Sequence, residues 1–137
     1  MPSKCQGMTK SILEKGKKML KNSYSPYSEF QVGCVAVTHD GQEFAGCNIE
    51  NTSYSLTVCA EVSAISNMVS SGHTSIQAIF IFSNSEQFVT PCGACRQTIA
   101  EFADHDIPVY LVNQKNEIRK HQLSLLIPHA FDLELQQ

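Results

Sequence analysis

Apolar residues recur along the chain with two periods, one typical of helices and one typical of strands. Helical spacing predicts three helices: one over residues 11–21, one over residues 60–69, and one that opens at Thr90-Pro91 and reaches about residue 103. Short apolar and β-branched runs predict strands at residues 32–38, 43–49, 76–82 and 109–112 and near residue 118. Residues 123–127 suggest a short final helix.

Local signals predict where these elements begin and end. Ser11 and Glu14 have the spacing of a capping box, in which two side chains satisfy free backbone N–H groups at the start of a helix. Asp40 and the glycine after it predict a hairpin turn, so the strands that flank them should be antiparallel. Gly72 is expected to end the second helix, and Pro91 suits the first turn of the third.

The order of the elements predicts the fold class. Because the second half of the chain alternates between strands and helices, part of the sheet must be parallel. The strands are apolar throughout, so both faces of the sheet need helical cover. We therefore predict an α/β fold: a three-layer α/β/α sandwich with a mixed sheet of about five strands. A length of 137 residues favours a single domain over residues 1–137.

Composition and charge argue against several classes of protein. The net charge is −3, although six of the ten cationic residues lie within the first 21 positions. No aromatic residues are interleaved with those lysines, which indicates a solvated helix face and not a nucleic-acid patch. The longest apolar run, residues 78–82, is far shorter than the ~20 residues of a membrane span, and no secretory signal is visible. We predict a cytoplasmic protein that binds no polynucleotide and no membrane.

The cysteines indicate metal or redox chemistry, because disulfides are rare in cytoplasmic chains of this size. Of the six, Cys34 and Cys47 lie in strand-like runs, where a cysteine is most often a small buried apolar residue. Three others, Cys59, Cys92 and Cys95, should lie in the first turns of the second and third helices. A helix amino terminus carries about half a positive charge, which lowers the pKa of a nearby thiol.

The spacing of these three cysteines predicts a zinc site. Cys92 and Cys95 share a helix face and can bind one ion together. If the two helices begin side by side, Cys59 supplies a third ligand, and the fourth position of zinc stays open to water. Glu61, two residues after Cys59, can then reach the open side and carry a proton from bound water. This is the zinc deaminase signature, ligand-x-Glu followed by Pro-Cys-x-x-Cys, with Cys instead of His as the first ligand.

Other interpretations of the same residues remain open. A thioredoxin-type redox pair at Cys92 and Cys95 would leave Cys59 and Glu61 without a role. A structural zinc site would need a fourth ligand, and the five histidines are scattered without paired spacing. A glutamate alone would be interpreted as a solvated surface residue, but its place beside Cys59 favours a function.

At these residues the sequence resembles the short homotetrameric zinc-dependent cytidine deaminases, over nearly its whole length. The likeness includes the motifs Tyr27-Ser-Glu-Phe30, Val32-Gly, Gly46-Cys-Asn-Ile-Glu-Asn and Pro91-Cys-Gly-Ala-Cys-Arg-Gln. It implies hydrolytic deamination of free cytidine and deoxycytidine to uridine and deoxyuridine, with release of ammonia, as a step of pyrimidine salvage. It also implies one zinc ion per chain, a zinc-bound hydroxide as nucleophile, and a homotetramer whose sites are completed by neighbouring subunits.

The resemblance assigns further roles to single residues. It implies that Asn48 and Glu50 bind the sugar hydroxyls, that Phe30 lines the pyrimidine pocket and that Ala60 meets the base through its backbone. Glu61 would hold N3 of the ring and then the leaving amine. Two aromatic residues, Tyr54 and Phe131, resemble positions that reach or border the site of a neighbouring subunit.

The chain departs from the pattern of the family in two places: Ser55-Leu-Thr57 replaces a commoner Pro-x-Gly, and Val62 replaces an arginine. Relatives with three cysteine ligands typically have arginine where this chain has Val62. We hypothesise that Arg96, next to Cys95, supplies part of the missing positive charge, the alternative being a surface or interface ion pair. Two rival functions also stay open: deamination of a modified cytosine nucleoside or blasticidin-type antibiotic, and a non-catalytic zinc-binding or RNA-interacting module.

Overall fold

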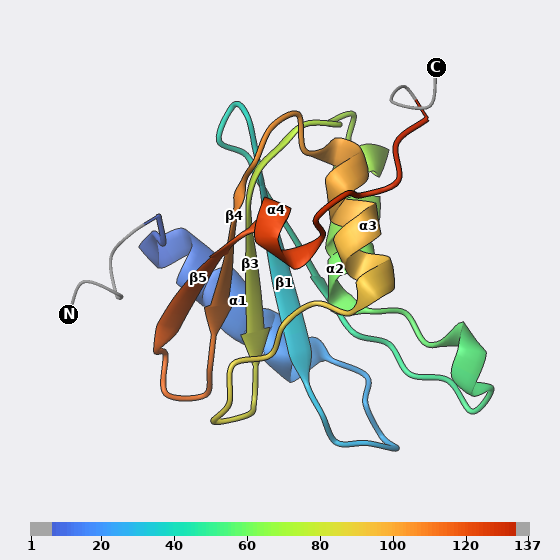
Figure 1. Ribbon diagram of the computed structural model, residues 1–137. Helices are drawn as coiled ribbons and strands as arrows, with labels where there is room; N and C mark the ends of the chain where they lie inside the picture. The colour runs from blue at the N-terminus through green and yellow to red at the C-terminus, as the bar shows by residue number, and fades with distance from the viewer. Residues whose placement is uncertain (1–6, 134–137) are drawn as a thin grey trace.

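A mixed sheet of five strands forms the centre of the computed structural model, which describes residues 7–133 (Figure 1). The strands are β1 (Val32–Thr38), β2 (Glu43–Cys47), β3 (Ile76–Ser83), β4 (Pro108–Val112) and β5 (Ile118–Gln122). They lie in the order β2-β1-β3-β4-β5. β3 and β4 are parallel, and the other neighbouring pairs are antiparallel, which confirms the predicted mixed sheet.

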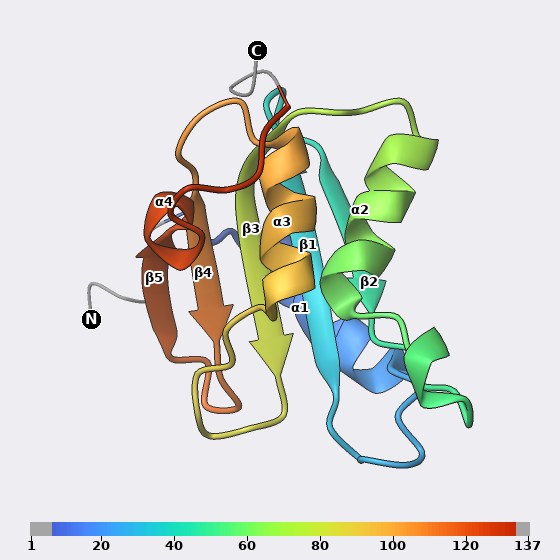
Figure 2. The same ribbon diagram turned by 45° about the vertical axis from the view of Figure 1, so that its right-hand side comes forward.

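Helices cover both faces of the sheet, as predicted (Figures 1 and 2). One face carries α1 (Lys10–Asn22), and the other carries α2 (Ala60–Ser70), α3 (Gly93–Phe102) and α4 (Leu123–Leu126). A short 3-10 helix, η2 (Tyr54–Leu56), lies between β2 and α2. Within residues 7–133 there is no helix with the length and apolar character needed to cross a membrane.

Alternate residues of the central strands enter two separate cores, which explains why these strands are apolar along most of their length. In β3, Ile79 and Ile81 share a core with α2 and α3, whereas Phe80 and Phe82 share one with α1. Burying each such side chain contributes about 1.5–3 kcal/mol. Cys34 is fully buried in the first of these cores, as predicted. Cys47 is half-buried, and Cys5 lies outside the described residues.

The sheet and α2 approach each other so closely that one position requires glycine. A Cβ atom at Gly46 of β2 would lie 2.3 Å from the backbone nitrogen of Ala64 and 2.6 Å from the carbonyl carbon of Ser63. Because both of these atoms belong to the backbone, no side-chain rotation can relieve the contact. Gly46 therefore lets α2 lie directly on β2, which sets the place of the helix end that carries Cys59.

The predicted start of the first helix is wrong. α1 begins at Lys10, and its N-cap is Thr9, whose Oγ1 accepts a hydrogen bond from the Ile12 N–H group at 3.1 Å. The Ser11 hydroxyl, predicted to cap the helix, donates to Glu43 of β2 instead, at 2.7 Å. Both Thr9 and Ser11 are residue types that cap helices. Because the Ser11 side chain is bound to Glu43 of β2, Thr9 is the residue that caps α1.

Two other element ends differ from the prediction. β2 ends at Cys47, and Ile49 forms isolated bridges with Tyr24 and Val58 instead of continuing along β1. Cys92 is the N-cap of α3, so the proline before it lies outside the helix and not in its first turn. The hairpin turn and the end of α2 are where they were expected, and the glycines there, Gly41 and Gly72, have φ of 86° and 94°.

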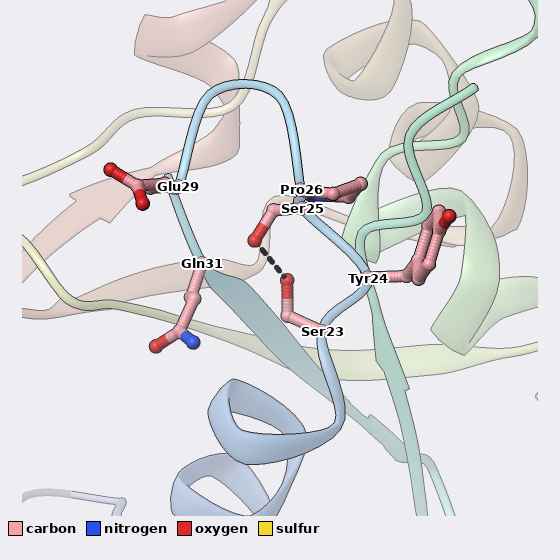
Figure 3. A pocket seen from close by; sticks show the side chains of 6 residues that line it. All are labelled: Ser23, Tyr24, Ser25, Pro26, Glu29 and Gln31. Carbon is pink, nitrogen blue, oxygen red and sulfur yellow. Dashed lines mark hydrogen bonds between the residues drawn. The ribbon is translucent and has the colours of Figure 1, made fainter. Parts of the chain in front are cut away.

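The segment that joins α1 to β1 bows away from the sheet and encloses a shallow hollow (Figure 3). The hollow is lined by this one segment: Ser23, Tyr24, Ser25, Pro26, Glu29 and Gln31. The segment lies at the same end of the molecule as the amino termini of α2 and α3 (Figure 2). The three thiols and Glu61, at the starts of α2 and α3, therefore lie at the same end as Phe30.

Candidate metal and catalytic site

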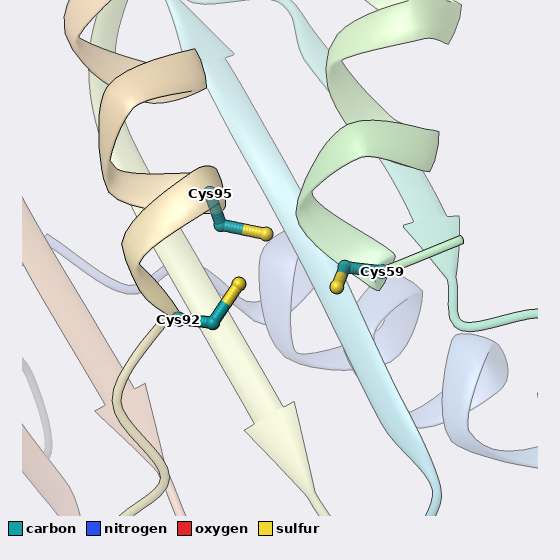
Figure 4. A group of neighbouring side chains, drawn as sticks. All are labelled: Cys59, Cys92 and Cys95. Atoms are coloured by element: carbon teal, nitrogen blue, oxygen red, sulfur yellow. The ribbon is translucent and has the colours of Figure 1, made fainter. Parts of the chain in front are cut away.

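Three thiols converge between the amino termini of α2 and α3 (Figure 4). Cys59 is the N-cap of α2, Cys92 is the N-cap of α3, and Cys95 lies in the first turn of α3. Their Sγ atoms all lie within 4.8 Å of one another. The structure thus brings together the three cysteines that the sequence predicted as ligands, at the helix ends where they were expected.

The backbone explains why these thiols face each other. Cys59 and Cys92 both have extended backbone conformations, and their carbonyl oxygens accept the first helical hydrogen bonds, from Ser63 at 3.0 Å and Arg96 at 2.9 Å. Neither cysteine carries the side-chain oxygen that usually caps a helix. A Ser, Thr, Asp or Asn in each place would stabilise the helix by about 1 kcal/mol, so both helices give up stability to keep a thiol there.

The pKa values of the thiols differ because their surroundings differ. Hydrogen bonds, first of all from the backbone N–H group of Cys95, lower the pKa of Cys92. Burial raises the pKa of Cys95, and the negative charges of Glu61 and Cys59 raise it further. Burial also raises the pKa of Cys59. Without a cation, the cluster therefore accommodates negative charge first on Cys92.

This donor set fits zinc. Thiolates are preferred zinc ligands, and a nearby divalent cation favours the deprotonation that burial opposes at Cys59 and Cys95. Among residues 7–133, no fourth His, Cys, Asp or Glu joins the cluster of mutually close ligand atoms. Three protein ligands are the number found in catalytic zinc sites, which keep a position for water or substrate.

Glu61 lies beside the thiols without belonging to their cluster. It is the second residue of α2, and only 5% of its surface is exposed. Burial raises the pKa of its carboxyl group, against the opposing effect of hydrogen bonds from its own N–H group and from the Cys95 thiol. A carboxyl group with a raised pKa can exchange protons nearer to neutral pH, which suits a general acid and base.

Asn48 and Glu50 follow β2 and bind the backbone of the segment that leads into β1. Asn48 is 8% exposed; its Nδ2 donates to the carbonyl oxygen of Phe30 at 2.8 Å, and its Oδ1 accepts from the Val32 N–H group at 3.0 Å. The Glu50 carboxylate accepts from the N–H groups of Tyr27 (3.0 Å) and Ser28 (3.2 Å) and from the Ser28 hydroxyl.

These bonds have a consequence for Glu50. The Ser28 hydroxyl, followed by the backbone N–H groups, lowers the pKa of the Glu50 carboxyl group, so it is a charged acceptor at neutral pH. Ser28 lies within the motif Tyr27-Ser-Glu-Phe30, and no role was predicted for it. Its only sequence signal is its place two residues before Phe30, which does not reveal a partner in another segment.

The remaining predicted residues have different exposures. Ala60 is the first residue of α2 and is 1% exposed. Phe30 is 38% exposed, Tyr54 is 88% exposed and Phe131 is 63% exposed. Gln97 of α3 donates to the carbonyl oxygen of Phe131 at 3.1 Å, which ties the tail to the helix that carries two of the thiols. Large aromatic side chains this exposed mark surfaces that a partner can cover.

Arg96 binds backbone carbonyl groups within the described part of the chain. Its Nε donates to Pro91 at 2.8 Å, and its Nη1 donates to Leu126 of α4 at 2.7 Å. The guanidinium group therefore joins the residue before Cys92 to the end of α4. Val62 lines an apolar groove between α2 and α3 together with Ile65, Ser66, Val69, Ser70, Thr98 and Phe102.

The thiol geometry predicts that Cys92→Ala loses zinc. Changing a residue that hydrogen-bonds to a metal ligand typically weakens metal binding by roughly 10–100-fold. Removing a ligand itself should weaken zinc binding by more than this. Metal analysis of the purified variant, with a chelator competition, measures the loss. Cys47→Ala, which removes a half-buried thiol outside the cluster, is the control and should keep about one zinc ion per chain. Full zinc content in Cys92→Ala would contradict the assignment.

Comparison with known proteins connects this geometry to a family. Residues 8–111 match the family model of the cytidine and deoxycytidylate deaminase zinc-binding region. The chain is 44% identical over 123 residues to a cytidine deaminase of Sporosarcina psychrophila, with 90% of each chain covered. It is 43% identical over 114 residues to a cytidine deaminase of Halalkalibacterium halodurans, with 83% of this chain and 86% of the relative covered.

A solved structure agrees with these relatives. The crystal structure of cytidine deaminase from Burkholderia pseudomallei matches with a TM-score of 0.83 and 37% sequence identity, and the match covers 90% of this chain and 100% of that one. The region that matches the family model contains all three clustered thiols and Glu61. Since the relatives also align over most of their own length, the chain belongs to the cytidine and deoxycytidylate deaminase family of zinc-binding proteins.

Proposed function

We propose that this protein hydrolyses free cytidine and deoxycytidine to uridine and deoxyuridine and releases ammonia. The observation that carries the proposal is the buried Glu61 carboxyl group beside three thiols that face one another. The relatives named cytidine deaminase support the choice of a cytosine nucleoside as substrate. In the overall reaction, a C4–O bond to water forms, and the bond from C4 to the exocyclic nitrogen breaks.

In this proposal the cysteines bind the metal and Glu61 transfers the protons. Cys59, Cys92 and Cys95 would hold zinc, which supplies Lewis acidity that lowers the pKa of a water molecule. Glu61 takes a proton from the attacking water and delivers it to N3 of the ring. Glu61 then takes the second proton of that water from the oxygen now bound to C4 and carries it to the exocyclic amine, so that C4=O forms as the C4–N bond breaks and ammonia leaves. Burial of Glu61 keeps bulk water away from these transfers and raises its pKa toward the range that they need.

The sugar and the base would be held by the segment beside this centre. Asn48 and Glu50 are proposed to bind the sugar hydroxyls, and the charged Glu50 carboxylate is a strong acceptor for them. The half-exposed ring of Phe30 is proposed to line the pyrimidine pocket, and the backbone of Ala60 to meet the base. Two backbone N–H groups and the Ser28 hydroxyl hold the Glu50 carboxylate in place, so it can accept a further hydrogen bond from a sugar hydroxyl.

We also propose that the active form is a homotetramer, in which Tyr54 and Phe131 border the site of a neighbouring subunit. Their exposure supports this proposal, as does the apolar groove between α2 and α3. A step of pyrimidine salvage in the cytoplasm remains the expectation for the physiological role.

Glu61→Gln tests the proton transfers. Glutamine keeps the shape of the side chain but cannot carry the proton, so kcat for cytidine should fall by at least the ~10²–10⁴ assigned to general acid–base catalysis. Zinc content and the circular dichroism spectrum should not change. Ammonia release measures turnover, with deoxycytidine and blasticidin assayed in parallel to define the substrate class. Glu101→Gln, an exposed position on α3, is the control. Near-normal turnover in Glu61→Gln would assign the shuttle to another residue.

Glu50→Ala tests sugar recognition. Loss of a hydrogen bond to a charged acceptor should lower kcat/KM for cytidine by about 10–150-fold. Steady-state kinetics measure the change, and zinc content should persist because Glu50 is not among the clustered ligand atoms. Glu86→Ala removes an exposed carboxylate whose ion-pair partner is Lys115, and it should leave kcat/KM unchanged. An unaltered kcat/KM in Glu50→Ala would remove this residue from the sugar site.

Phe131→Ala tests the contribution of a neighbouring subunit. If the ring is buried in the assembly, its loss removes about 1.5–3 kcal/mol of apolar contact, and kcat/KM should fall by roughly 10–150-fold with zinc retained. Leu133→Ala, at an exposed apolar position of the same tail, is the matched control. Light scattering gives the oligomeric state of both variants and of the parent. A fully active monomer would refute the shared site.

A further inference from the structure

Hydrogen bonds to other segments, not core packing, hold the backbone around Phe30. Residues 27–30 are exposed, and the segment arches over the hollow of Figure 3. The ring of Phe30 lies in neither of the two cores. The position of this ring therefore depends on the groups that bind the peptide units on either side of it.

Two asparagine side chains bind these peptide units from opposite sides. Asn84, the first residue after β3, accepts from the Gln31 N–H group at 3.1 Å and donates to the Glu29 carbonyl oxygen at 3.0 Å. Asn84 thus binds residues 29 and 31, whereas Asn48 binds residues 30 and 32, through the carbonyl oxygen of Phe30 and the N–H group of Val32. Along an extended chain, alternate residues point their backbone groups to opposite sides, so the two amides act as short substitutes for neighbouring strands.

The backbone conformation of Glu29 gives the hydrogen bond from Asn84 a structural role. Its φ is 59°, in the left-handed region that residues other than glycine rarely adopt. Such a conformation persists only where the surroundings hold it, and Asn84 binds the carbonyl group of this residue directly. Without this bond Glu29 keeps only the hydrogen bond from its N–H group to the Ser25 carbonyl oxygen (2.9 Å) among those the structure shows for its backbone, so its carbonyl side can shift and Phe30, the next residue, would move with it.

Asn84 is well placed to hold this segment. The residue before it, Ser83, pairs with Val32 in the β1–β3 ladder, and the Asn84 N–H group donates to the Gln31 carbonyl oxygen at 3.2 Å. Asn84 also begins the loop that leads from β3 to the thiol of Cys92. It connects the segment that carries Phe30 to the loop that carries a metal ligand.

We propose that Asn84 is a positioning residue for substrate binding, whose two-way amide holds the backbone on both sides of Phe30 so that the ring lines the pyrimidine pocket. This inference rests on the proposed function, because it takes the pocket role of Phe30 from there. Asn84 does not contact the reacting atoms in this scheme; it acts through Phe30.

Asn84→Asp is the sharpest test, because aspartate has nearly the same shape and keeps the acceptor for Gln31. It replaces the donor by an oxygen atom that faces the Glu29 carbonyl oxygen. We expect KM for cytidine to rise about 10-fold, with kcat changed by less than about 3-fold and zinc content unchanged. Asn84→Ala, which adds no charge, should raise KM in the same direction.

A double-mutant cycle separates positioning from a general loss of stability. If Asn84 acts through Phe30, Asn84→Asp should have little further effect on KM in a Phe30→Ala background. Asn113→Asp is the control: Asn113 is another two-way amide, which donates to the carbonyl oxygen of Glu86 and accepts from the N–H groups of Lys115 and Glu117. It should lower the melting temperature without raising KM.

A second measurement does not depend on activity. The chain contains no tryptophan, so Phe30→Trp introduces a single fluorescent reporter at the pocket. Adding Asn84→Asp should increase acrylamide quenching and lower the anisotropy of this reporter, and adding Asn113→Asp should change neither.

Several results would overturn the proposal: an unchanged KM in Asn84→Asp, a KM effect that persists in full without the Phe30 ring, or an equal effect of Asn113→Asp on KM or on the reporter. If Phe30→Ala alone leaves KM unchanged, Phe30 does not line the pocket and the role of Asn84 in substrate binding fails with it. A loss of cytidine deamination in the parent protein would instead refute the proposed function, and the reporter would still show whether Asn84 orders the segment.

Discussion

Two helices that begin side by side present free N–H groups and partial positive charges to the same space, which is unfavourable unless negative groups lie between them. In this protein Cys59 and Cys92 occupy the two N-cap positions, and neither carries the side-chain oxygen that usually caps a helix. Their thiols instead face one another and Cys95, with the Sγ atoms within 4.8 Å. Three thiolates outnumber the two positive charges of a zinc ion by one, so the helix ends stabilise the excess negative charge. Val62 supplies no charge here, and the guanidinium group of Arg96 binds carbonyl groups.

The topology of the sheet places these helix ends together. β1 is antiparallel to both β2 and β3, so β2, β3 and β4 all run in one direction. α2 connects β2 to β3 and α3 connects β3 to β4, and both connections step the same way across the sheet. Right-handed crossovers that step the same way lie on the same face, and each helix begins at the carboxyl end of the strand before it. Both amino termini thus lie at one edge of the sheet, and the antiparallel β1 begins at that edge too, which places Phe30 there.

Periodicity was sufficient to predict most of this fold, because burial on two faces leaves continuous apolar strands and amphipathic helices in the sequence. The Cys92 and Cys95 pair was also visible locally, since their spacing fits one turn of a helix. Cys59 joins this pair only because the crossover connections place the starts of the two helices side by side. The sequence predicted Cys59 as a ligand only on the condition that the helices are arranged in this way. Asn84 gave no signal at all: its partners Gln31 and Glu29 lie 53 and 55 positions away, and an asparagine after a strand normally indicates a turn. The capping box of Ser11 and Glu14 favoured Ser11 over Thr9 as the N-cap, whereas the hydrogen bond from Ser11 to Glu43 of β2 has no local signal in the sequence.

The site therefore has two parts that are held by different forces. The helix ends are fixed by the close contact at Gly46 and by the core beneath α2 and α3, which cannot shift without a large loss of packing. The segment around Phe30 is fixed by hydrogen bonds, each of which contributes only about 0.5–1.5 kcal/mol net because water competes for the same groups. A centre that must hold its ligands in one geometry lies on the rigid part, and the residues proposed to contact the nucleoside lie mainly on the part that can adjust. Within this adjustable part, two backbone N–H groups and the Ser28 hydroxyl hold the Glu50 carboxylate in place. A sugar hydroxyl that binds Glu50 would add a hydrogen bond to a carboxylate that the segment has already oriented.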